Sequence, residues 1–333
     1  MKQPTPRRAL LAAAAAALLA GLPHAPAQAQ APAFPDRPVR VVVPFAPGNT
    51  LDTALRQVAE EFKKNTGQAL VVDNKPGGSG IIAAQIVMQA PPDGYTLLLS
   101  NTSMLTINPY TFAKLPYDAE KSFKHVTGFL GASMVMAVNA ANVPANDVKE
   151  FIAWARTQPG GASYASFTAG NSSHFAGVIM NQRTGLNMVH VPFNGTPPAV
   201  QNLVGGQVQA AFLPLLAVKP HVESGKVKVL AVTSPKRSPL MPNVPTFAEQ
   251  GLADMQIYIW SGLSAPAGTP DAVVQRIQQE FAKVLRSEVI IEKWRAMDFE
   301  PLPFTSAQYL DFIRADAKRW SEAVRISGFK ASE

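Results

Sequence analysis

The chain has 333 residues, 47% of them hydrophobic, and a formal net charge of +7. Its length suits two medium-sized domains, and its positive charge forms no basic run, so nucleic acid binding is not expected. The absence of cysteine excludes disulfides, thiolate metal sites, cysteine nucleophiles and a cysteine-linked lipid anchor.

Residues 1–31 are predicted to be a secretory signal peptide. Lys2, Arg7 and Arg8 form a positive start, and the apolar run Ala9–Leu22 is too short to span a bilayer. An amphipathic buried helix is the alternative, but the run has no polar face. Two small-x-small cleavage sites follow, Ala27-Gln28-Ala29 and Ala29-Gln30-Ala31. We therefore expect export to a bacterial periplasm, by the general route or, given the Arg7-Arg8 pair, by the twin-arginine route.

A first set of alternating strands and helices follows the leader. Compact apolar runs predict strands at Val39–Phe45, Ala69–Asn74 and Thr96–Ser100, with helical patterns over 50–65 and 79–90 between them. This βαβαβ order predicts a parallel sheet covered by helices on both faces.

A second set repeats this order. Its predicted strands are Ala162–Phe167, Met188–Phe193, Gln209–Leu213 and Val227–Val232, and its helices are 147–157, 172–184, 197–204 and 215–224. Two tail helices follow, one after the N-cap Thr269 and one after the capping box of Thr305 and Gln308.

The tail helices need a sheet to cover, and packing them on the first set makes that lobe discontinuous. We predict lobe 1 at 32–135 and 256–333 and lobe 2 at 136–255, with crossings near Met134–Asn139 and Gln256–Ile259. A ligand cleft is then expected between the lobes.

No catalytic motif is present in the sequence. It lacks G-x-S-x-G, H-E-x-x-H and a G-x-G-x-x-G after a strand. No histidine has a partner Cys, Asp or Glu at metal-ligand spacing, so neither a metal nor a cofactor is expected. An exported hydrolase or isomerase remains the enzymatic alternative, but it would need a nucleophile and a base, and no such pair is visible. We expect a binding protein and not an enzyme.

The loop after the first strand is the first candidate binding site. It joins a buried strand to a helix, and free backbone N–H groups at a helix start suit an anion. The loop has no Lys, Arg, Cys or His, so it is suited to hold a small acid without transforming it. The candidate residues are Phe45, Ala46, Pro47, Gly48, Asn49, Thr50 and Asp52. Asp52 has two possible roles. It could be a structural partner for the helix dipole, or it could face the cleft and either orient the loop or accept from a ligand donor.

Polar loops also follow other predicted strands. The further candidates are Thr102, Ser103, Thr168, Ala169, Gly170, Asn171, Ser172, His174, Phe193, Asn194, Gly195 and Thr196. Ordinary capping and turn chemistry explains any one loop, but four loops meeting at the carboxyl ends of two parallel sheets indicate a ligand cleft. Trp260 and Phe45 are core residues unless the ligand is flat and apolar, in which case they join the site.

Several motifs in the chain resemble those of one family. They are Val43-Pro44-Phe45-Ala46-Pro47-Gly48 with Asp52 and Arg56, Asp73-Asn74-Lys75-Pro76-Gly77-Gly78, Pro92-Asp93-Gly94-Tyr95, His190-Val191-Pro192-Phe193 with Gly195, and Ala265-Pro266-Ala267-Gly268-Thr269-Pro270. With them the chain closely resembles, from Phe34 nearly to the C-terminus, the Bug (Bordetella uptake gene) proteins. These are extracytoplasmic receptors of tripartite tricarboxylate transporters.

The resemblance implies an α/β fold, a two-lobed periplasmic binding protein of type II, each lobe a mostly parallel sheet flanked by helices. It implies a small carboxylate bound by Ala46–Thr50 on one side and by Thr168–Ser172, His174 and Asn194–Thr196 on the other. The expected partners are this carboxylate and the membrane permease subunits, and the receptor is expected to be monomeric.

Two residues depart from the family pattern. Asn49 stands where the family usually has a second glycine, and Asn194 where it often has lysine. An added amide and a missing cation favour a mono- or dicarboxylate, with an apolar or aromatic body, over a tricarboxylate such as citrate. A ligand-sensing module of a signalling system remains open beside transport, since nothing in the sequence separates the two.

Overall fold

The computed structural model describes residues 34–331, so the predicted signal peptide lies outside the described residues. The strands are β1 (Val39–Val43), β2 (Leu70–Asn74), β3 (Thr96–Asn101), β4 (Phe123–Asn139), β5 (Ser163–Ser166), β6 (Val189–Pro192), β7 (Ala210–Pro214), β8 (Val227–Val232), β9 (Tyr258–Pro266) and β10 (Phe299–Pro301). The helices are α2 (Thr50–Thr66), α3 (Ile81–Met88), α4 (Asn108–Thr111), α5 (Val148–Ala155), α6 (Ser172–Thr184), α7 (Thr196–Val204), α8 (Leu215–Glu223), α9 (Asp271–Leu285), α10 (Glu288–Arg295) and α11 (Ser306–Ser327). Within residues 34–331, no helix combines the length and apolarity that a bilayer crossing requires.

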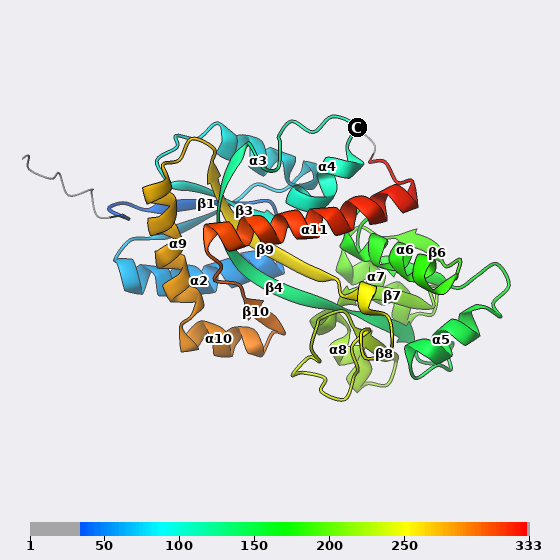
Figure 1. The fold of residues 1–333 in the computed structure, drawn as a ribbon. Coiled ribbons are helices and arrows are strands. Elements are labelled where there is room, and N and C mark those ends of the chain that lie inside the picture. Colours follow the sequence, from blue (N-terminus) through cyan, green and yellow to red (C-terminus); the bar gives the residue numbers. More distant parts are fainter. Residues whose placement is uncertain (1–33, 332–333) are drawn as a thin grey trace, which may run out of the picture. The chain divides into compact units, whose positions relative to one another are not determined.

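Strand β4 links two groups of strands into one sheet (Figure 1). The first sheet half has the order β2-β1-β3-β9-β4, with β10 also on β4; the second has the order β4-β7-β5-β6, with β8 also on β4. The partners of β4 change at one point. Up to Ser133 it pairs with β9 and β10, and from Met134 it pairs with β7 and β8.

All seven strands predicted in the two sets are present; six of them form the two parallel groups, whereas the seventh, β8, pairs antiparallel with β4. β1 runs parallel to β2 and β3, and β5 runs parallel to β6 and β7. Every pair that includes β4 or β9 is antiparallel, which makes the whole sheet mixed. Of β4, only Met134–Asn139 was expected, as a crossing segment. The first part of β4, the strand β10, the helix α10 and the π-helical turn η2 (Ser103–Ile107) were not predicted.

Helices α2 and α9 bury their apolar faces on the first sheet half. Leu55, Val58 and Phe62 of α2 share one core with Ile277 and Phe281 of α9. The rings of Phe62 and Phe281 lie 5.2 Å apart between centroids. Each such buried side chain stabilises the fold by about 1.5–3 kcal/mol relative to exposure, so this packing fixes α2 and the loop before it.

The last helix, α11, contributes to the cores of both sheet halves. Its capping box of Thr305 and Gln308 is present as predicted. Tyr309 packs in the core that contains β3 and β9 residues, whereas Trp320 and Val324 pack in the core of the second sheet half. Figure 1 shows α11 lying along both groups of strands.

Candidate ligand-binding site

The loop between β1 and α2 has a defined turn. Gly48 has φ +81°, a value that favours glycine, and a Cβ there would meet no atom within 4 Å. Asn49 then adopts extended dihedrals and caps α2, because its Oδ1 accepts from the backbone N–H of Leu51 at 3.0 Å. The amide that departs from the family pattern therefore has a structural role as a helix cap.

Asp52 holds this loop by four hydrogen bonds from three residues. Its carboxylate accepts from the backbone N–H of Gly48 at 2.9 Å, from Nε and Nη2 of Arg56 at 3.0 Å each, and from Nδ2 of Asn74 at 2.9 Å. The same Nδ2 donates to the carbonyl of Phe45 at 3.0 Å. The Asp52 side chain is thereby engaged on both oxygens, and the residue is only 1% exposed.

The hydrogen bonds to the Asp52 carboxylate also change its pKa. Burial alone would raise its pKa, but the hydrogen bonds from Arg56, Gly48 and Asn74 favour the charged form and lower the pKa below its ordinary value. Of the two readings of Asp52, this geometry supports the one in which it orients the loop.

The start of α2 keeps backbone N–H groups free. Leu51 donates to Asn49 Oδ1, and Thr53 donates to the Asn49 carbonyl. Among the hydrogen bonds of residues 34–331, none uses the N–H of Thr50 or Asp52, as expected in the first turn of a helix. These donors and the helix dipole favour an anion at this point.

Helix α6 begins in the same manner. Asn171 has extended dihedrals, and its Oδ1 accepts from the N–H of Ser173 at 3.0 Å and of His174 at 3.2 Å. The Ser173 hydroxyl donates to that same oxygen and accepts from the N–H of Phe167. Gly170, with φ +74°, precedes the cap.

A backbone hydrogen bond joins the two second-half loops. Gly195 donates its N–H to the carbonyl of Phe167 at 2.8 Å, which brings the loop before α7 beside the loop before α6. The start of α7 has fewer donors than that of α6, because Pro197 and Pro198 have no N–H. Thr196 is thus the main backbone donor that α7 contributes.

His174 and His190 stack directly below these loops. Their ring centroids lie 3.8 Å apart with an 11° angle between the planes. Burial lowers the pKa of His174 to about 4, and burial together with the neighbouring His174 lowers the pKa of His190 to about 4. Both rings are therefore neutral near pH 7 and supply no positive charge to the site.

Thr102 and Trp260 lie together in the interior. The Thr102 hydroxyl accepts from the N–H of Trp260 at 2.9 Å and donates to its carbonyl at 3.1 Å. The indole N–H of Trp260 donates to Asp316 at 2.7 Å, and the residue is 1% exposed. These contacts support the core reading of Trp260 and join the end of β3 to β9.

The remaining sequence-predicted residues fall into three exposure groups. Exposed are Ala46, Pro47, Gly48, Asn49, Thr50, Thr168, Ala169 and Asn194; half-buried are Phe45, Ser103, Gly170, Phe193, Gly195 and Thr196; buried are Asn171, Ser172 and His174. Phe45 packs against the core of the first sheet half and Phe193 against a core of the second. Sequence reasoning did not include Asn74 or Phe329 in the site, although Asn74 fixes the first loop and the Phe329 ring contacts His174.

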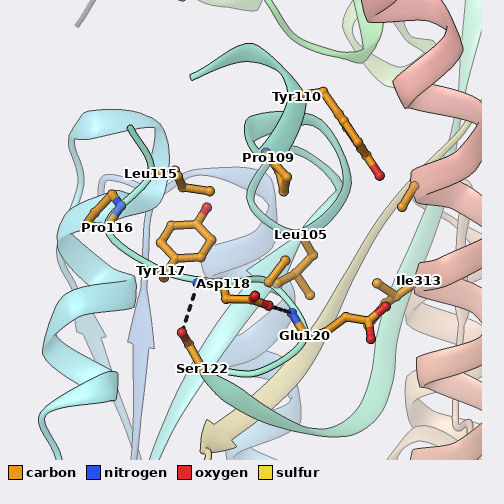
Figure 2. Close-up of a pocket in the computed structure, with 12 residues that line it drawn as sticks. Leu105, Pro109, Tyr110, Leu115, Pro116, Tyr117, Asp118, Glu120, Ser122 and Ile313 are labelled. Atoms are coloured by element: carbon orange, nitrogen blue, oxygen red, sulfur yellow. Dashed lines mark hydrogen bonds between the residues drawn. The ribbon is translucent and has the colours of Figure 1, made fainter. Parts of the chain in front are cut away.

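A cavity of about 680 Å³ lies elsewhere, between η2, α4, α11 and the segment before β4. Figure 2 shows Tyr110, Leu115, Tyr117, Asp118 and Glu120 around it. Asp118 accepts from the backbone N–H groups of Glu120 and Lys121, and Glu120 pairs with Arg314. Its charged lining residues are acidic, so this cavity does not suit an anionic ligand.

The fold is that of a periplasmic binding protein, with mixed α/β sheet halves and polar loops at strand ends. The chain belongs to the family described as the tripartite tricarboxylate transporter family receptor, whose model matches residues 54–329. Protein BugT of Bordetella pertussis is 30% identical over 305 residues, which cover 91% of this chain and 93% of BugT.

Two relatives have solved structures with a small acid. Rpa4515 of R. palustris, described with adipate, is 30% identical with a TM-score of 0.79, covering 89% of this chain and 99% of that one. MatC (Rpa3494) of Rhodopseudomonas palustris, described with bound malate, is 29% identical with a TM-score of 0.73, covering 87% of this chain and 100% of that one. Family members are thus solute-binding proteins, and these two hold dicarboxylates.

Proposed function

We propose that this protein is a receptor that binds a small mono- or dicarboxylate and delivers it to a membrane permease. The ligand would lie between the start of α2 and the paired loops before α6 and α7. In this proposal residues 32–135 and 256–333 form one lobe and 136–255 the other, and ligand contacts to both lobes stabilise a closed form.

One observation carries the proposal. α2 and α6 both start with a positive-φ glycine followed by a capping asparagine, and both keep backbone N–H groups without a partner in the described residues. A carboxylate is the ligand that such donors stabilise without a formal cation. The adipate and malate of the two relatives support the same ligand class.

The ligand's body and charge follow from the loop composition. Neither loop carries a lysine or arginine, and both nearby imidazoles are neutral at pH 7. Concentrating three carboxylates here would add repulsion with no cation to offset it. We therefore propose one or two carboxylates on an aliphatic or aromatic body, in preference to citrate.

A thermal-shift screen followed by calorimetry tests this proposal. The panel contains adipate, malate, benzoate, phthalate and citrate, with adipamide as the uncharged counterpart of adipate. We expect a shift with at least one mono- or dicarboxylate and none with adipamide. Equal shifts with adipate and adipamide, or no response to any acid, would contradict the proposal.

A matched pair of glycine variants tests the site. Gly48→Val and Gly251→Val impose the same backbone strain, since φ is +81° and +83° and a Cβ meets nothing within 4 Å at either position. Only Gly48 lies in the proposed site. We expect Gly48→Val to lose ligand binding and Gly251→Val to keep it. Normal affinity in Gly48→Val would overturn the assignment of this loop.

Export and delivery are separate parts of the proposal. Protein recovered from the periplasmic fraction is expected to begin at Gln30 or Pro32, after one of the two cleavage sites. Uptake of labelled ligand is expected to stop when the receptor gene is deleted and to return with the gene. Uptake that continues without the receptor would contradict delivery and would leave binding untouched.

A further inference from the structure

The stacked pair of His174 and His190 is the group that the proposed binding mode leaves without a role. Aromatic rings cover it on several sides. The Tyr164 ring lies 5.1 Å from His190, and the rings of Phe175 and Phe329 lie 4.8 and 5.3 Å from His174. His174 is only 7% exposed. Two charged imidazoles at this spacing would repel strongly, so the pair is stable when it is neutral.

Each ring is hydrogen-bonded to the segment 166–171. The N–H of Gly170 donates to Nδ1 of His174 at 3.2 Å, so the single proton of this neutral ring must lie on Nε2. Nε2 of His190 lies 2.7 Å from the Ser166 hydroxyl, which donates to the carbonyl of Thr168 at 3.1 Å. Since that hydroxyl has one proton, His190 is the donor in its bond to Ser166.

Protonation would change the first of these bonds. A second proton on His174 must go to Nδ1, where it faces the N–H of Gly170, and two donors replace a donor and an acceptor. Thr168 and Ala169 are exposed, and besides the bond to Nδ1 the turn has the Ser166 hydroxyl at the Thr168 carbonyl and the Phe329 ring beside Gly170. Losing the bond to Nδ1 removes the one hydrogen bond of the Gly170 N–H and so loosens the segment that precedes the Asn171 cap.

We propose that His174 is a positioning residue that holds Thr168–Asn171 in its ligand-binding form only while its ring is neutral, with His190 as the stacked partner. This inference rests on the proposed function for its effect on affinity. Uptake of a proton by the pair would release the loop and weaken carboxylate binding. The receptor would then capture its ligand at neutral pH and lose it in acid.

The surroundings of the pair add few charges. The titratable groups on the elements packed against α6 are Tyr164 on β5, His190 on β6, Asp254 on η3 (Ala253–Met255), and Tyr309, Asp311, Arg314, Asp316, Lys318, Arg319, Glu322 and Arg325 on α11. Asp254 pairs with Arg183, Glu322 pairs with Arg325, and Asp316 is held by two indoles and Thr106. Burial lowers the pKa of both imidazoles to about 4, so the change falls in the acid range.

Two variants of His174 separate its acceptor from its titration. His174→Phe keeps a stacking ring without the acceptor, and we expect roughly five-fold weaker binding at pH 7, the usual effect of one lost hydrogen bond. His174→Asn offers an oxygen acceptor that does not titrate, and we expect binding closer to wild type at pH 7. His125→Asn is the matched control, since His125 is also buried with its pKa lowered to about 4 but bonds to Ser264 and Ala119 away from this loop.

The pH dependence of affinity is measured by calorimetry, with adipate as the first probe and otherwise the strongest binder of the panel. Protonation of the ligand affects every variant equally, so the ratio of wild-type to His174→Asn affinity isolates the ring. We expect this ratio to fall about two-fold between pH 7 and pH 4. The His125→Asn ratio is expected to stay constant. Normal affinity in His174→Phe, or a constant His174→Asn ratio, would overturn the proposal.

Nuclear magnetic resonance tests the proposed role of His174 without any ligand. We expect ¹⁵N shifts of His174 to show a bare Nδ1 at pH 7, and the Gly170 amide resonance to titrate near pH 4 in the wild type but not in His174→Asn. If no carboxylate binds, the proposed function fails while this measurement still decides the role of His174. A Gly170 amide that does not respond to pH would overturn that role.

Discussion

The loops that begin α2 and α6 share a short sequence pattern, Gly48-Asn49-Thr50 in one and Gly170-Asn171-Ser172 in the other. In both, a positive-φ glycine is followed by an extended asparagine whose Oδ1 accepts from the N–H two residues further on. The parts that anchor them differ. Asp52, Arg56 and Asn74 hold the first loop, whereas neutral His174 and the Phe329 ring lie against the second.

This difference shows that one backbone geometry can be fixed by an ionised side chain or by a side chain that must stay neutral. The hydrogen bonds from Arg56, Gly48 and Asn74 lower the pKa of Asp52, so its carboxylate stays ionised to lower pH than that of a free aspartate. Beside the second loop, the His174 ring accepts from the Gly170 N–H only while it is neutral, whereas His190 donates to Ser166 in either charge state. The two loops are therefore expected to respond to acid, to substitution and to strain in different ways.

Lowering the pH should produce the largest change in the free energy of unfolding. His125, His174 and His190 have the ordinary pKa of 6.5 in the unfolded chain, and burial lowers the pKa of each to about 4 in the folded protein. As the pH falls from 6.5 towards 4 the unfolded chain takes up these protons first, so stability falls by roughly 1 kcal/mol per pH unit for each histidine. Asp298 and Asp316, whose pKa burial raises, offset part of this loss near pH 4. Urea midpoints at pH 7.0, 5.5 and 4.5 measure the net loss of stability. A midpoint that stays constant over this range would contradict the prediction.

Removing the charged anchor should have the next largest effect. In Asp52→Ala the hydrogen bonds of Gly48, Arg56 and Asn74 to the carboxylate are lost, and we expect about 2–3 kcal/mol of destabilisation. Urea denaturation at pH 7 measures the change. Glu322→Gln, which breaks an exposed pair with Arg325 on α11, is the control and should leave the midpoint unchanged. Equal midpoints for Asp52→Ala and wild type would show that Asp52 does not anchor the loop.

Alanine should cost less stability at Gly48 than at Gly170. Gly48→Ala adds a Cβ in open space, so only the left-handed backbone costs stability, about 1 kcal/mol. In Gly170→Ala the new Cβ would also lie 2.5 Å from the Phe329 ring, and we expect about 2 kcal/mol. Thermal midpoints measure both variants. Adding Phe329→Ala should remove the excess cost at Gly170 and change nothing at Gly48, and the absence of that coupling would count against the contact.

Removing the two asparagine caps should give the smallest difference in stability between the loops. Asn171 accepts from two backbone N–H groups and the Ser173 hydroxyl in a buried setting, whereas Asn49 accepts from Leu51 alone and is exposed. We expect about 1 kcal/mol of destabilisation for Asn171→Ala and about half of that for Asn49→Ala, by urea denaturation. A larger effect at Asn49 would reverse the order that burial predicts.

Local patterns in the sequence predicted much of this structure. The capping box of Thr305 and Gln308, the N-terminal prolines of α7 and the strands β1 to β3 could be predicted because their signals lie within a few residues. The first part of β4 could not, because Gly128 and Gly131 interrupt its pattern. The packing requires both glycines, since a Cβ at Gly131 would lie 2.1 Å from the Tyr258 ring and one at Gly128 would lie 2.6 Å from the carbonyl of Leu302.

The candidate loops were predicted from strand ends and turn residues, but their anchors were not. Asn74 contacts Asp52 from 22 residues away, and His174 meets His190 from a different element. Phe329 reaches the second loop from beyond α11. Such contacts depend on tertiary packing, and no local pattern encodes them.

The shared strand β4 has a mechanical consequence. All 17 of its residues from Phe123 to Asn139 belong to a single strand that pairs first with one sheet half and then with the other. Any rotation between the halves must bend this ribbon, which already carries irregular register near Thr127, Leu130 and Ala137. Elastic strain would then be spread over many small dihedral changes and several bulges. A single glycine substitution in β4 should therefore soften the proposed closure without abolishing it, whereas a proline there would remove a hydrogen bond of the sheet.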